Sequence, residues 1–535
     1  MKLSFTRHFL YKHGDSLLAS VVGFAIIHIF ARHGGIGISP DSVAYISTAR
    51  NFANGEGFAL FDGNPLVAFP LFYPFFLASV MGITQVDILD CAPLLNATMF
   101  GIVIFLSGIL MSRFTAQSRI YKVVLLSVIS LSPALIEIYS MLWSETLFIL
   151  LSLLFFLSMR SYLAKPNLAY LILTAAVIAV AFDTRFVGIT LVATGFVLIA
   201  FNRASSWRTR LLHTAVFSIA SCSLVVANLI RNAMNSQHLT GPRQKGITPL
   251  SDNVAYSARI FSEWSSLKGV NYLLEIALCV GVMLFFAWLL YLNWRKEGKY
   301  QTYENIVLVF FIIYVSFIIV TSTISRYEQI NNRLLSPAFL PFIWGMSHKI
   351  PSLIKRVEQK KYQWQLSIVF AIVYALACVG YFSINADNYS FMKDSGIPGY
   401  TEDIWKESPT INYLKQHSTY FHPDSMVYSN HNQAVYLYTN YAVDMLPEKA
   451  YKSDVKMFMD ESPIILIWFN LEPNTDLLSL QDIMKRKHLT VLHEFADGTI
   501  YKLTNIEPKK KRKNKKRYRF NLLSQKVTQE AVYRE

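Results

Sequence analysis

Asp41 is the residue of this sequence whose surroundings best fit a catalytic group. Ser39 and Pro40 precede it, and these residue types are typical of the cap and the first turn of a helix. Asp41 then lies in the first turn, where the helix dipole stabilises a carboxylate, and Tyr45 follows one turn later. A carboxylate held in this way could accept a proton from an attacking hydroxyl. The alternative is that Asp41 only stabilises its own helix.

The composition indicates that this helix belongs to a membrane protein. The chain has 535 residues, of which 53% are hydrophobic and 16% are charged. Soluble domains carry about 25% charged residues, and a single soluble core stops growing at about 250–300 residues. Apolar runs that could form membrane helices occupy eleven ranges: 16–31, 91–112, 122–138, 144–163, 168–182, 187–201, 211–230, 271–292, 304–323, 335–348 and 366–384.

Lysines and arginines in the short loops predict how these helices are oriented. Basic loops face the cytoplasm, and such loops lie at 113–122, 160–167, 202–210, 294–303 and 349–363. The N-terminus is therefore expected in the cytoplasm, with residues 33–90 and everything after about 385 outside. A further apolar run at 65–83 is interrupted by three prolines, which break helix interiors. We expect that run to be a re-entrant or surface-lying element rather than a twelfth span.

These patterns predict a polytopic α-helical membrane protein of about 11 transmembrane helices with a small C-terminal extracytoplasmic α/β domain. The transmembrane domain is expected at 1–384, and its first outer loop, 33–90, would carry the active site. Residues 385–505 are more polar and would form the outer domain. Its candidate elements are a helix at 408–417 and strands at 426–430, 462–469 and 490–504, the last with an Asp-Gly turn signal.

Residues 506–535 form a basic tail that is expected to be disordered. Nine of the eleven residues at 509–519 are lysine or arginine, out of a net charge of +15 for the chain. Such a run is typical of nucleic-acid binding, but its predicted place outside the cell argues against that partner. A solvated tail and a tail that binds anionic lipid both stay open.

The cysteines and histidines predict no cofactor. The four cysteines form no CxxC pair, and the histidines are scattered along the chain. No metal ligands are therefore assigned, and a divalent metal is neither indicated nor excluded.

The order of several short motifs resembles the GT-C glycosyltransferases, which are multi-spanning membrane enzymes that use lipid-linked sugars. The first outer loop contains D-S-x-x-Y-x-x-x-A from Asp41 onward, then G-E-G-F at 55–58 and P-L-F-Y-P at 70–74. The later motifs are WSETLF (143–148), DTRFVG (183–188), RN…TGPR (231–243) and RLLSP (333–337). The resemblance covers residues 1 to about 345 and is closest to the bacterial branch related to protein mannosyltransferases and aminoarabinose transferases.

The resemblance implies that a sugar is transferred with inversion from a polyprenyl-phosphate donor to an extracytoplasmic glycan, lipid or protein at a bacterial plasma membrane. It implies that Asp41 is the catalytic base and that Glu145 is a second acid of the site, although Glu145 could be an ordinary helix-end charge. Among the aromatic residues of the first outer loop, Tyr45, Phe72 and Tyr73 are expected to contact the sugar or the prenyl chain. A transporter or flippase of a lipid-linked or anionic substrate is the alternative function.

Such a donor requires cations at its phosphate, and the fork of an arginine matches phosphate oxygens. The candidates on the predicted outer face are Arg185, Arg231, Arg243 and Arg333. Arg185 could instead pair internally with Asp183. Arg231 and Arg243 could be solvated loop charges, and Arg333 could reach lipid headgroups.

Overall fold

The computed structural model describes the chain at residues 2–114, 118–236, 238–241, 243–266, 271–296, 298–421, 426–471 and 474–506. For residues 2–11 and Ser418 only the backbone is described. The basic run at 509–519 lies outside the described residues, so its predicted disorder and lipid binding stay predictions. The chain packs as two units, Met1–Ser408 and Pro409–Glu535.

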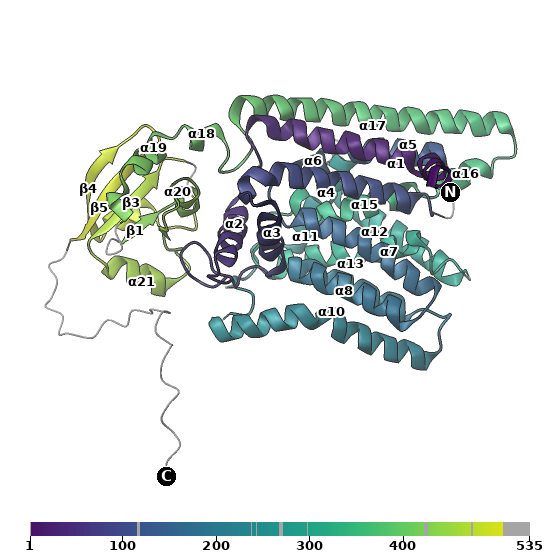
Figure 1. The fold of residues 1–535 in the computed structure, drawn as a ribbon, viewed down its shortest axis with the longest axis horizontal. Helices are drawn as coiled ribbons and strands as arrows, with labels where there is room; N and C mark the ends of the chain where they lie inside the picture. Colours follow the sequence, from purple (N-terminus) through teal and green to yellow (C-terminus); the bar gives the residue numbers. More distant parts are fainter. Residues whose placement is uncertain are drawn as a thin grey trace, which may run out of the picture. The chain divides into compact units, whose positions relative to one another are not determined.

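Long apolar helices make up most of the first unit (Figure 1). In the described ranges, seven helices have the length and hydrophobicity to cross a membrane, and each coincides with a predicted span. They are α1 (Lys2–Phe30), α4 (Ile88–Met111), α7 (Glu145–Ala164), α10 (Trp207–Asn235), α12 (Tyr272–Arg295), α13 (Tyr303–Ile324) and α17 (Lys360–Ser395). Large apolar side chains of α17, such as Leu376 and Phe382 at 65% exposure each, require lipid to cover them.

The other four predicted spans are also helical, but they are shorter or broken. The first is α5 (Arg119–Ser130) followed by α6 (Pro133–Tyr139), bent by 51°. Pro133 explains the break, because proline does not fit the interior of a helix and here opens α6. The remaining three are α8 (Leu168–Thr184), α9 (Ile189–Ala200) after η2 (Phe186–Gly188), and α14 (Asn332–Leu335) followed by η3 (Ser336–Ala338) and α15 (Phe339–Ser347). The predicted number of eleven crossings therefore stays a prediction.

Two helices of the first outer segment lie crosswise at one end of the bundle, as Figure 1 shows for α2 (Pro40–Ala53) and α3 (Phe72–Thr84). α3 has 13 residues, which corresponds to about 20 Å, whereas the bilayer core measures about 30 Å. The helix in the run at 65–83 is therefore shorter than the bilayer core is thick, and the re-entrant or surface-lying place expected of this run stays a prediction.

The last part of the first unit returns to the start of α2. α17 continues to Ser395 and ends at Gly396, whose φ is 81°. The backbone N–H of Tyr400 then donates to the carbonyl of Ile38 at 2.7 Å. A side chain at Gly399 would meet that carbonyl oxygen at 2.3 Å, so this close approach requires glycine. Residues 385–408 thus pack within the helical unit, which also contains α11 (Leu250–Trp264), α16 (Ile350–Lys355) and α18 (Asp403–Lys406).

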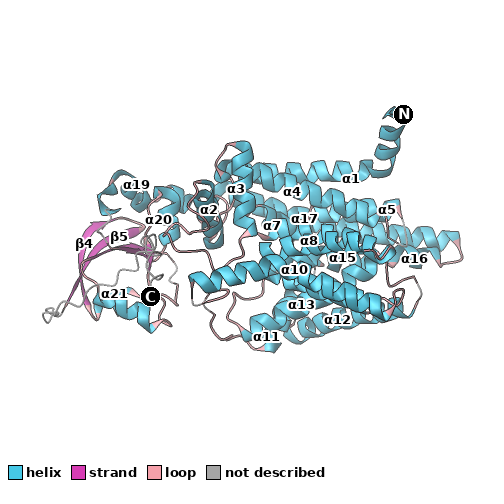
Figure 2. Ribbon diagram, turned by 60° about the horizontal axis from the view of Figure 1, so that its bottom comes forward, coloured by secondary structure: helices cyan, strands magenta, loops and turns pink. Residues whose placement is uncertain are grey.

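The second unit is built on a five-stranded sheet, and all strands drawn in Figure 2 belong to it. The strand order is β2-β1-β3-β5-β4, with β1 parallel to β2 and β3, and with β5 antiparallel to β3 and β4. The strands are β1 (Val427–Ser429), β2 (Asp444–Met445), β3 (Ile464–Phe469), β4 (Lys487–Glu494) and β5 (Gly498–Asn505). The helices are α19 (Pro409–Gln416), η4 (Ser418–Phe421), α20 (Asn432–Thr439), α21 (Lys452–Asp460) and α22 (Leu480–Met484).

The core of this unit follows from the alternation of apolar residues along the strands. Ile464 and Leu466 of β3 and Leu503 of β5 point to one face, where Phe458 and Ile483 pack against them. The predicted helix at 408–417 and the strands at 426–430, 462–469 and 490–504 are confirmed. The place of this unit outside the cell stays a prediction.

Candidate active site

The start of α2 is fixed by its own cap and by the chain that leads into α7. Ser39 and Ser42 form a reciprocal capping box, in which the N–H of Ser39 donates to Ser42 Oγ at 3.0 Å. The indole N–H of Trp143 also donates to Ser39 Oγ, at 2.8 Å. The backbones meet as well, because the N–H of Leu142 donates to the carbonyl of Gly37 at 2.9 Å. These contacts bring Asp41 next to the first turn of α7.

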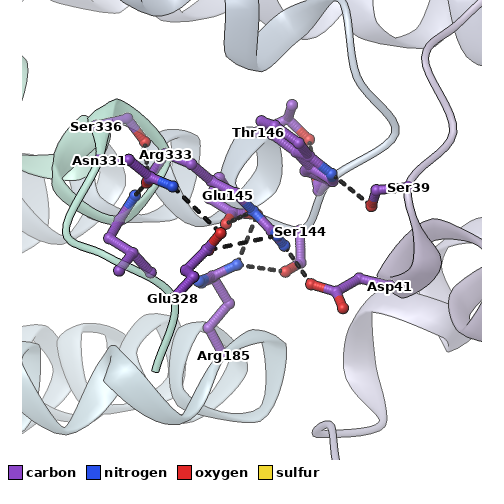
Figure 3. Close-up of polar contacts among 12 residues, drawn as sticks. Ser39, Asp41, Ser144, Glu145, Thr146, Arg185, Glu328, Asn331, Arg333 and Ser336 are labelled. Carbon is purple, nitrogen blue, oxygen red and sulfur yellow. Dashed lines mark hydrogen bonds and ion pairs between the residues drawn. The ribbon is translucent and has the colours of Figure 1, made fainter. Parts of the chain in front are cut away.

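Glu145 opens α7 and its side chain is fully buried, with 0% exposure. Arg185 Nη1 lies 2.6 Å from Glu145 Oε2, and Arg333 Nε lies 2.7 Å from Glu145 Oε1. Arg333 Nη2 also donates to Asp41 Oδ2. Figure 3 shows this arrangement, in which Arg333 lies between two carboxylates and Glu145 lies between two guanidinium groups. Arg185 pairs with Glu145 and not with Asp183, so the internal pair considered for it is not formed.

The carboxylates keep both arginines charged despite their burial. Burial disfavours the charged form of Arg185, but Glu145 outweighs this effect and raises the pKa of the guanidinium. Burial likewise opposes the charge of Arg333, whereas Glu145 and then Asp41 raise its pKa. The guanidinium carbon of Arg333 also lies 4.4 Å from the centre of the Trp143 ring, a cation–π contact. The site therefore holds two fixed cations without an external anion.

Ser144 links the arginine pair to Tyr45. Arg185 Nη1 donates to Ser144 Oγ at 2.9 Å, and the hydroxyl of Tyr45 lies 3.3 Å from the same oxygen. The ring of Tyr45 meets the ring of Tyr73 edge-on at 5.0 Å. Tyr45 lines the cavity described next, whereas Tyr73 is fully buried behind it. Burial raises the pKa of both phenols, so both stay neutral hydrogen-bonding groups.

A cavity of about 690 Å³ opens onto these side chains. Asp41 and four arginines contribute to its wall, namely Arg185, Arg243, Arg326 and Arg333. Apolar residues form another part of its wall: Ala68, Phe69, Pro70, Phe186, Val187, Phe317 and Ile318. A cavity with clustered guanidinium groups and an apolar wall suits a ligand that has an anionic head and a hydrocarbon chain.

Arg243 reaches the cavity from the loop after α10, which pairs with the segment after α13. The N–H of Gly246 donates to the carbonyl of Ile324 at 2.8 Å, and the N–H of Arg326 donates to the carbonyl of Gln244 at 2.9 Å. The Arg243 guanidinium is exposed and donates to the hydroxyl of Tyr327 at 3.2 Å. Arg243 therefore lines the cavity, and its guanidinium donates to a tyrosine hydroxyl rather than to a carboxylate.

Arg231 is the one predicted phosphate ligand that the structure places elsewhere. Its Nη1 donates to the carbonyl of Leu66 and its Nη2 to the carbonyl of Phe58, both at 2.9 Å. It does not contribute to the described lining of the cavity. Its guanidinium holds the loop that precedes α3.

Sequence reasoning did not single out Ser144, Trp143 or Glu328. The first two stand directly before Glu145 in WSETLF, and this adjacency was the available signal. The sequence contains no such signal for Glu328. Only the folding of the chain brings its Oε1 to 3.8 Å from Arg333 Nη1. Burial raises the pKa of the Glu328 carboxyl, against the lowering effect of Arg333. Among the described residues, no group of three or more His, Cys, Asp or Glu side chains could hold a metal.

The fold of the chain is similar to that of solved membrane enzymes, although no family model and no curated protein sequence matches it. ArnT from Cupriavidus metallidurans in the apo state gives a TM-score of 0.57 at 11% identity, over 91% of this chain and 98% of its own. The same protein bound to undecaprenyl phosphate gives a TM-score of 0.55 over the same fractions of the two chains. The oligosaccharyltransferase of Archaeoglobus fulgidus, tethered with an acceptor peptide, gives 0.53 at 10% identity, over 86% of this chain and 69% of its own. The chain therefore has the GT-C fold of these glycosyltransferases, as its motifs predicted.

Proposed function

We propose that the chain is an inverting glycosyltransferase that moves a sugar from a polyprenyl-phosphate donor to an extracytoplasmic acceptor. The observation that carries the proposal is the cavity in which Asp41, Arg185 and Arg333 share a wall with apolar side chains. The fold adds support, because ArnT of the same fold has been solved with undecaprenyl phosphate bound.

The arginines of the cavity offer charge and N–H donors to the donor phosphate. Arg185 and Arg333 are held by Glu145, so their remaining N–H groups are oriented before a ligand arrives. Arg243 and Arg326 add cationic charge at the same cavity. The neighbouring apolar wall, with Phe317 and Ile318 of α13, would pack against the first prenyl units.

Asp41 can act as the base for the acceptor hydroxyl. The acceptor hydroxyl attacks the anomeric carbon of the donor sugar and forms the new C–O bond. The bond between that carbon and the phosphate oxygen breaks, and its electron pair leaves with polyprenyl phosphate. The proton of the hydroxyl passes to the Asp41 carboxylate. A single displacement of this kind inverts the anomeric centre.

The ion pair between Asp41 and Arg333 gives a physical reason why donor binding comes before reaction with the acceptor. In the structure Arg333 is shared between Asp41 and Glu145. A donor phosphate competes with Asp41 for the same guanidinium and weakens that contact. The Asp41 carboxylate is then free to accept a hydrogen bond from the acceptor hydroxyl, so donor binding prepares the base for the acceptor.

The substitution Asp41→Asn tests the proposal, because it removes the base and keeps the shape of the side chain. The purified chain would be mixed with undecaprenyl-phosphate-linked hexoses and pentoses, with bacterial membrane lipids as the acceptor pool. We expect Asp41→Asn to abolish sugar transfer in a chain that still folds. Undecaprenyl phosphate should bind at least as tightly as to wild type, because Asp41 no longer competes for Arg333. Asp62→Asn, at an exposed position of the same outer segment, is the matched control. Full transfer by Asp41→Asn would exclude the assignment.

Lipid vesicles that contain the purified chain and a labelled undecaprenyl-phosphate sugar separate transfer from transport. A transporter or flippase would move the intact labelled donor across the bilayer and leave the bond to phosphate unbroken. An enzyme would release undecaprenyl phosphate. Movement of intact donor without release would replace the proposed function by the transporter alternative.

A further inference from the structure

A smaller cavity of about 300 Å³ lies between two loops of the helical unit, the loop from α9 to α10 and the loop from α12 to α13. Gln301 lines this cavity, and α13 begins shortly after it, at Tyr303. Near its other end, α13 lines the cavity of Asp41 with Phe317 and Thr321. A helix rises about 1.5 Å per residue, so the two cavities lie about 20 Å or more apart along α13. The smaller cavity is therefore separate from the site proposed for sugar transfer.

Basic side chains line the smaller cavity. Arg203 comes from the first loop, whereas Arg295 and Lys296 come from the C-terminal end of α12, and all three are exposed. The guanidinium carbon of Arg203 lies 3.9 Å from the centre of the Trp294 ring, and Arg295 Nη1 donates to the hydroxyl of Tyr291 at 3.1 Å. Among the described residues, none of the three cations forms an ion pair with a carboxylate. The wall therefore offers positive charge to an anion.

Asn202 adds a buried hydrogen-bond donor to the same wall. The residue is 2% exposed. The backbone N–H of Ala204 donates to Asn202 Oδ1 at 3.2 Å, and this contact fixes which end of the amide is oxygen. The other end, Nδ2, is buried and has no hydrogen-bond acceptor in the part of the chain that the structure describes. A buried N–H group without an acceptor is costly, so an anion that supplies an acceptor would stabilise this loop.

The two loops are already joined at one point. The hydroxyl of Tyr300 donates to the carbonyls of Val197 and Leu198 at the end of α9, at 3.1 and 3.0 Å. Tyr300 also lines the cavity. An anion held by Asn202 of one loop and by the cations at the end of α12 would join the loops a second time.

The surroundings of this cavity favour a phospholipid as the source of the anion. Phe201 and Trp294 line the cavity and are exposed, and Trp207 at the start of α10 is 61% exposed. Exposed tryptophans at helix ends are typical of the membrane interface, where phospholipid heads lie. The segments 201–210 and 294–303 also contain six basic residues and one acidic residue. Such basic segments attract anionic lipid heads.

We propose that this cavity binds the phosphate of an anionic membrane phospholipid, such as phosphatidylglycerol, at the membrane face opposite the cavity of Asp41. The guanidinium groups and the Asn202 amide donate to the phosphate oxygens, and the exposed aromatic side chains pack against the lipid chains. A soluble phosphate compound offers the same oxygens but has no chains for these aromatic side chains. The site needs neither a sugar donor nor an acceptor, so it does not depend on the proposed function.

A binding titration of the purified full chain tests the site. Phosphatidylglycerol would be added to the chain in a neutral detergent at low salt, and bound lipid would be measured by native mass spectrometry. We expect phosphatidylglycerol to bind about tenfold more tightly than phosphatidylcholine, because the basic wall repels the trimethylammonium group. Glycerol 3-phosphate at millimolar concentration should not displace the lipid. Equal binding of the two lipids would overturn the proposal, and displacement by glycerol 3-phosphate would overturn its assignment to a lipid.

Arg203→Gln and Arg208→Gln form a matched pair of variants. Both arginines are exposed and each guanidinium lies over a tryptophan ring, but Arg203 lines the cavity and Arg208 does not. Arg203→Gln should weaken the binding of phosphatidylglycerol by about tenfold, whereas Arg208→Gln should bind it as wild type does. Equal losses in the two variants would show that the lipid responds to the net charge of this face and not to the cavity, which would overturn the proposal.

Asn202→Asp tests the buried donor. The aspartate can still accept the N–H of Ala204, but it replaces the Nδ2 donor by a carboxylate oxygen, which repels phosphate. Binding of phosphatidylglycerol to this cavity should therefore be lost. Wild-type binding by a folded Asn202→Asp chain would also overturn the proposal. If Asn202→Asp does not fold, the comparison of Arg203→Gln with Arg208→Gln decides the matter.

Discussion

Arg333 and Arg231 are both arginines on the predicted outer face, and the fold uses them differently. Arg333 lies between the carboxylates of Asp41 and Glu145, with the Trp143 ring against its guanidinium and a cavity before it. Arg231 donates to two backbone carbonyls of the loop before α3. The acceptors around an arginine, rather than its position at a helix end, therefore decide whether its guanidinium can bind a ligand or hydrogen-bonds to the backbone.

The two arginines still act on the same cavity. The loop that Arg231 holds, residues 58–66, leads directly into Ala68, Phe69 and Pro70, which line the cavity of Asp41. Arg231 is therefore expected to place an apolar part of the wall. Arg333 is expected to contact the donor phosphate and to tune the base.

Among the residues around Arg333 and Arg231, the largest effect is expected from Arg333→Ala. The change removes a preorganised cation from the phosphate and the partner of Asp41, so transfer should fall by about 1,000-fold or more. Arg333→Lys keeps the charge but loses the fork that reaches both carboxylates, and about a 100-fold loss is expected from it. Transfer rates and binding of undecaprenyl phosphate are the measurements.

The exposed Arg32 in η1 offers the matched control, since Arg32→Ala removes the same charge from a residue that does not line the cavity of Asp41. If Arg333→Ala behaved like Arg32→Ala, the contrast between Arg333 and Arg231 would have no functional meaning.

The second-largest effect is expected from Glu145→Gln, which lowers the stability of the fold and, with it, the transfer rate. Glu145 is fully buried and is the shared partner of Arg185 and Arg333. Its loss leaves two buried cations with one remaining carboxylate, and removing one partner from a buried ion pair costs about 3–5 kcal/mol. The melting temperature in detergent should drop clearly, and transfer should fall with it. A wild-type melting curve would show that Glu145 is solvated and that the arginines are not held by it.

These contrasts also show which features of the structure can be predicted from the sequence alone. Ser39, Pro40 and Asp41 are neighbours in the chain, so the cap of α2 and the place of its carboxylate follow from local rules. The strands of the second unit follow from alternation and from the Asp497-Gly498 turn in the same way.

The partners of the arginines do not follow from local rules. Arg333 and Glu145 are 188 positions apart, and Arg231 meets Leu66 across 165 positions. Which acceptor an arginine finds depends on how the helices pack, so Arg185 could not be assigned to Glu145 rather than to Asp183 from spacing alone. Glu328 was missed for the same reason, because it reaches the site only through the segment after α13.

A smaller effect is expected from Arg231→Ala. The carbonyl of Leu66 loses its arginine donor, whereas the carbonyl of Phe58 keeps the backbone N–H of Leu66. A buried carbonyl left without a donor costs about 1–3 kcal/mol. The apolar wall would loosen, so transfer should fall by about tenfold, mainly through a higher KM. Binding of undecaprenyl phosphate should show the same dependence on salt as in wild type. A collapse of binding like that of Arg333→Ala would show that Arg231 contacts phosphate after all.

The smallest effect is expected from Arg243→Gln. Arg243 lines the cavity like Arg333, but its guanidinium is exposed and donates to the Tyr327 hydroxyl. Salt weakens the attraction between an exposed charge and its ligand, because the field of the charge decays over a Debye length of about 10 Å at 0.1 M salt. Undecaprenyl phosphate should therefore bind a few-fold more weakly at low salt, and the difference from wild type should vanish as salt is raised. A loss that persists at high salt would place Arg243 with Arg333, as a buried contact of the bound phosphate.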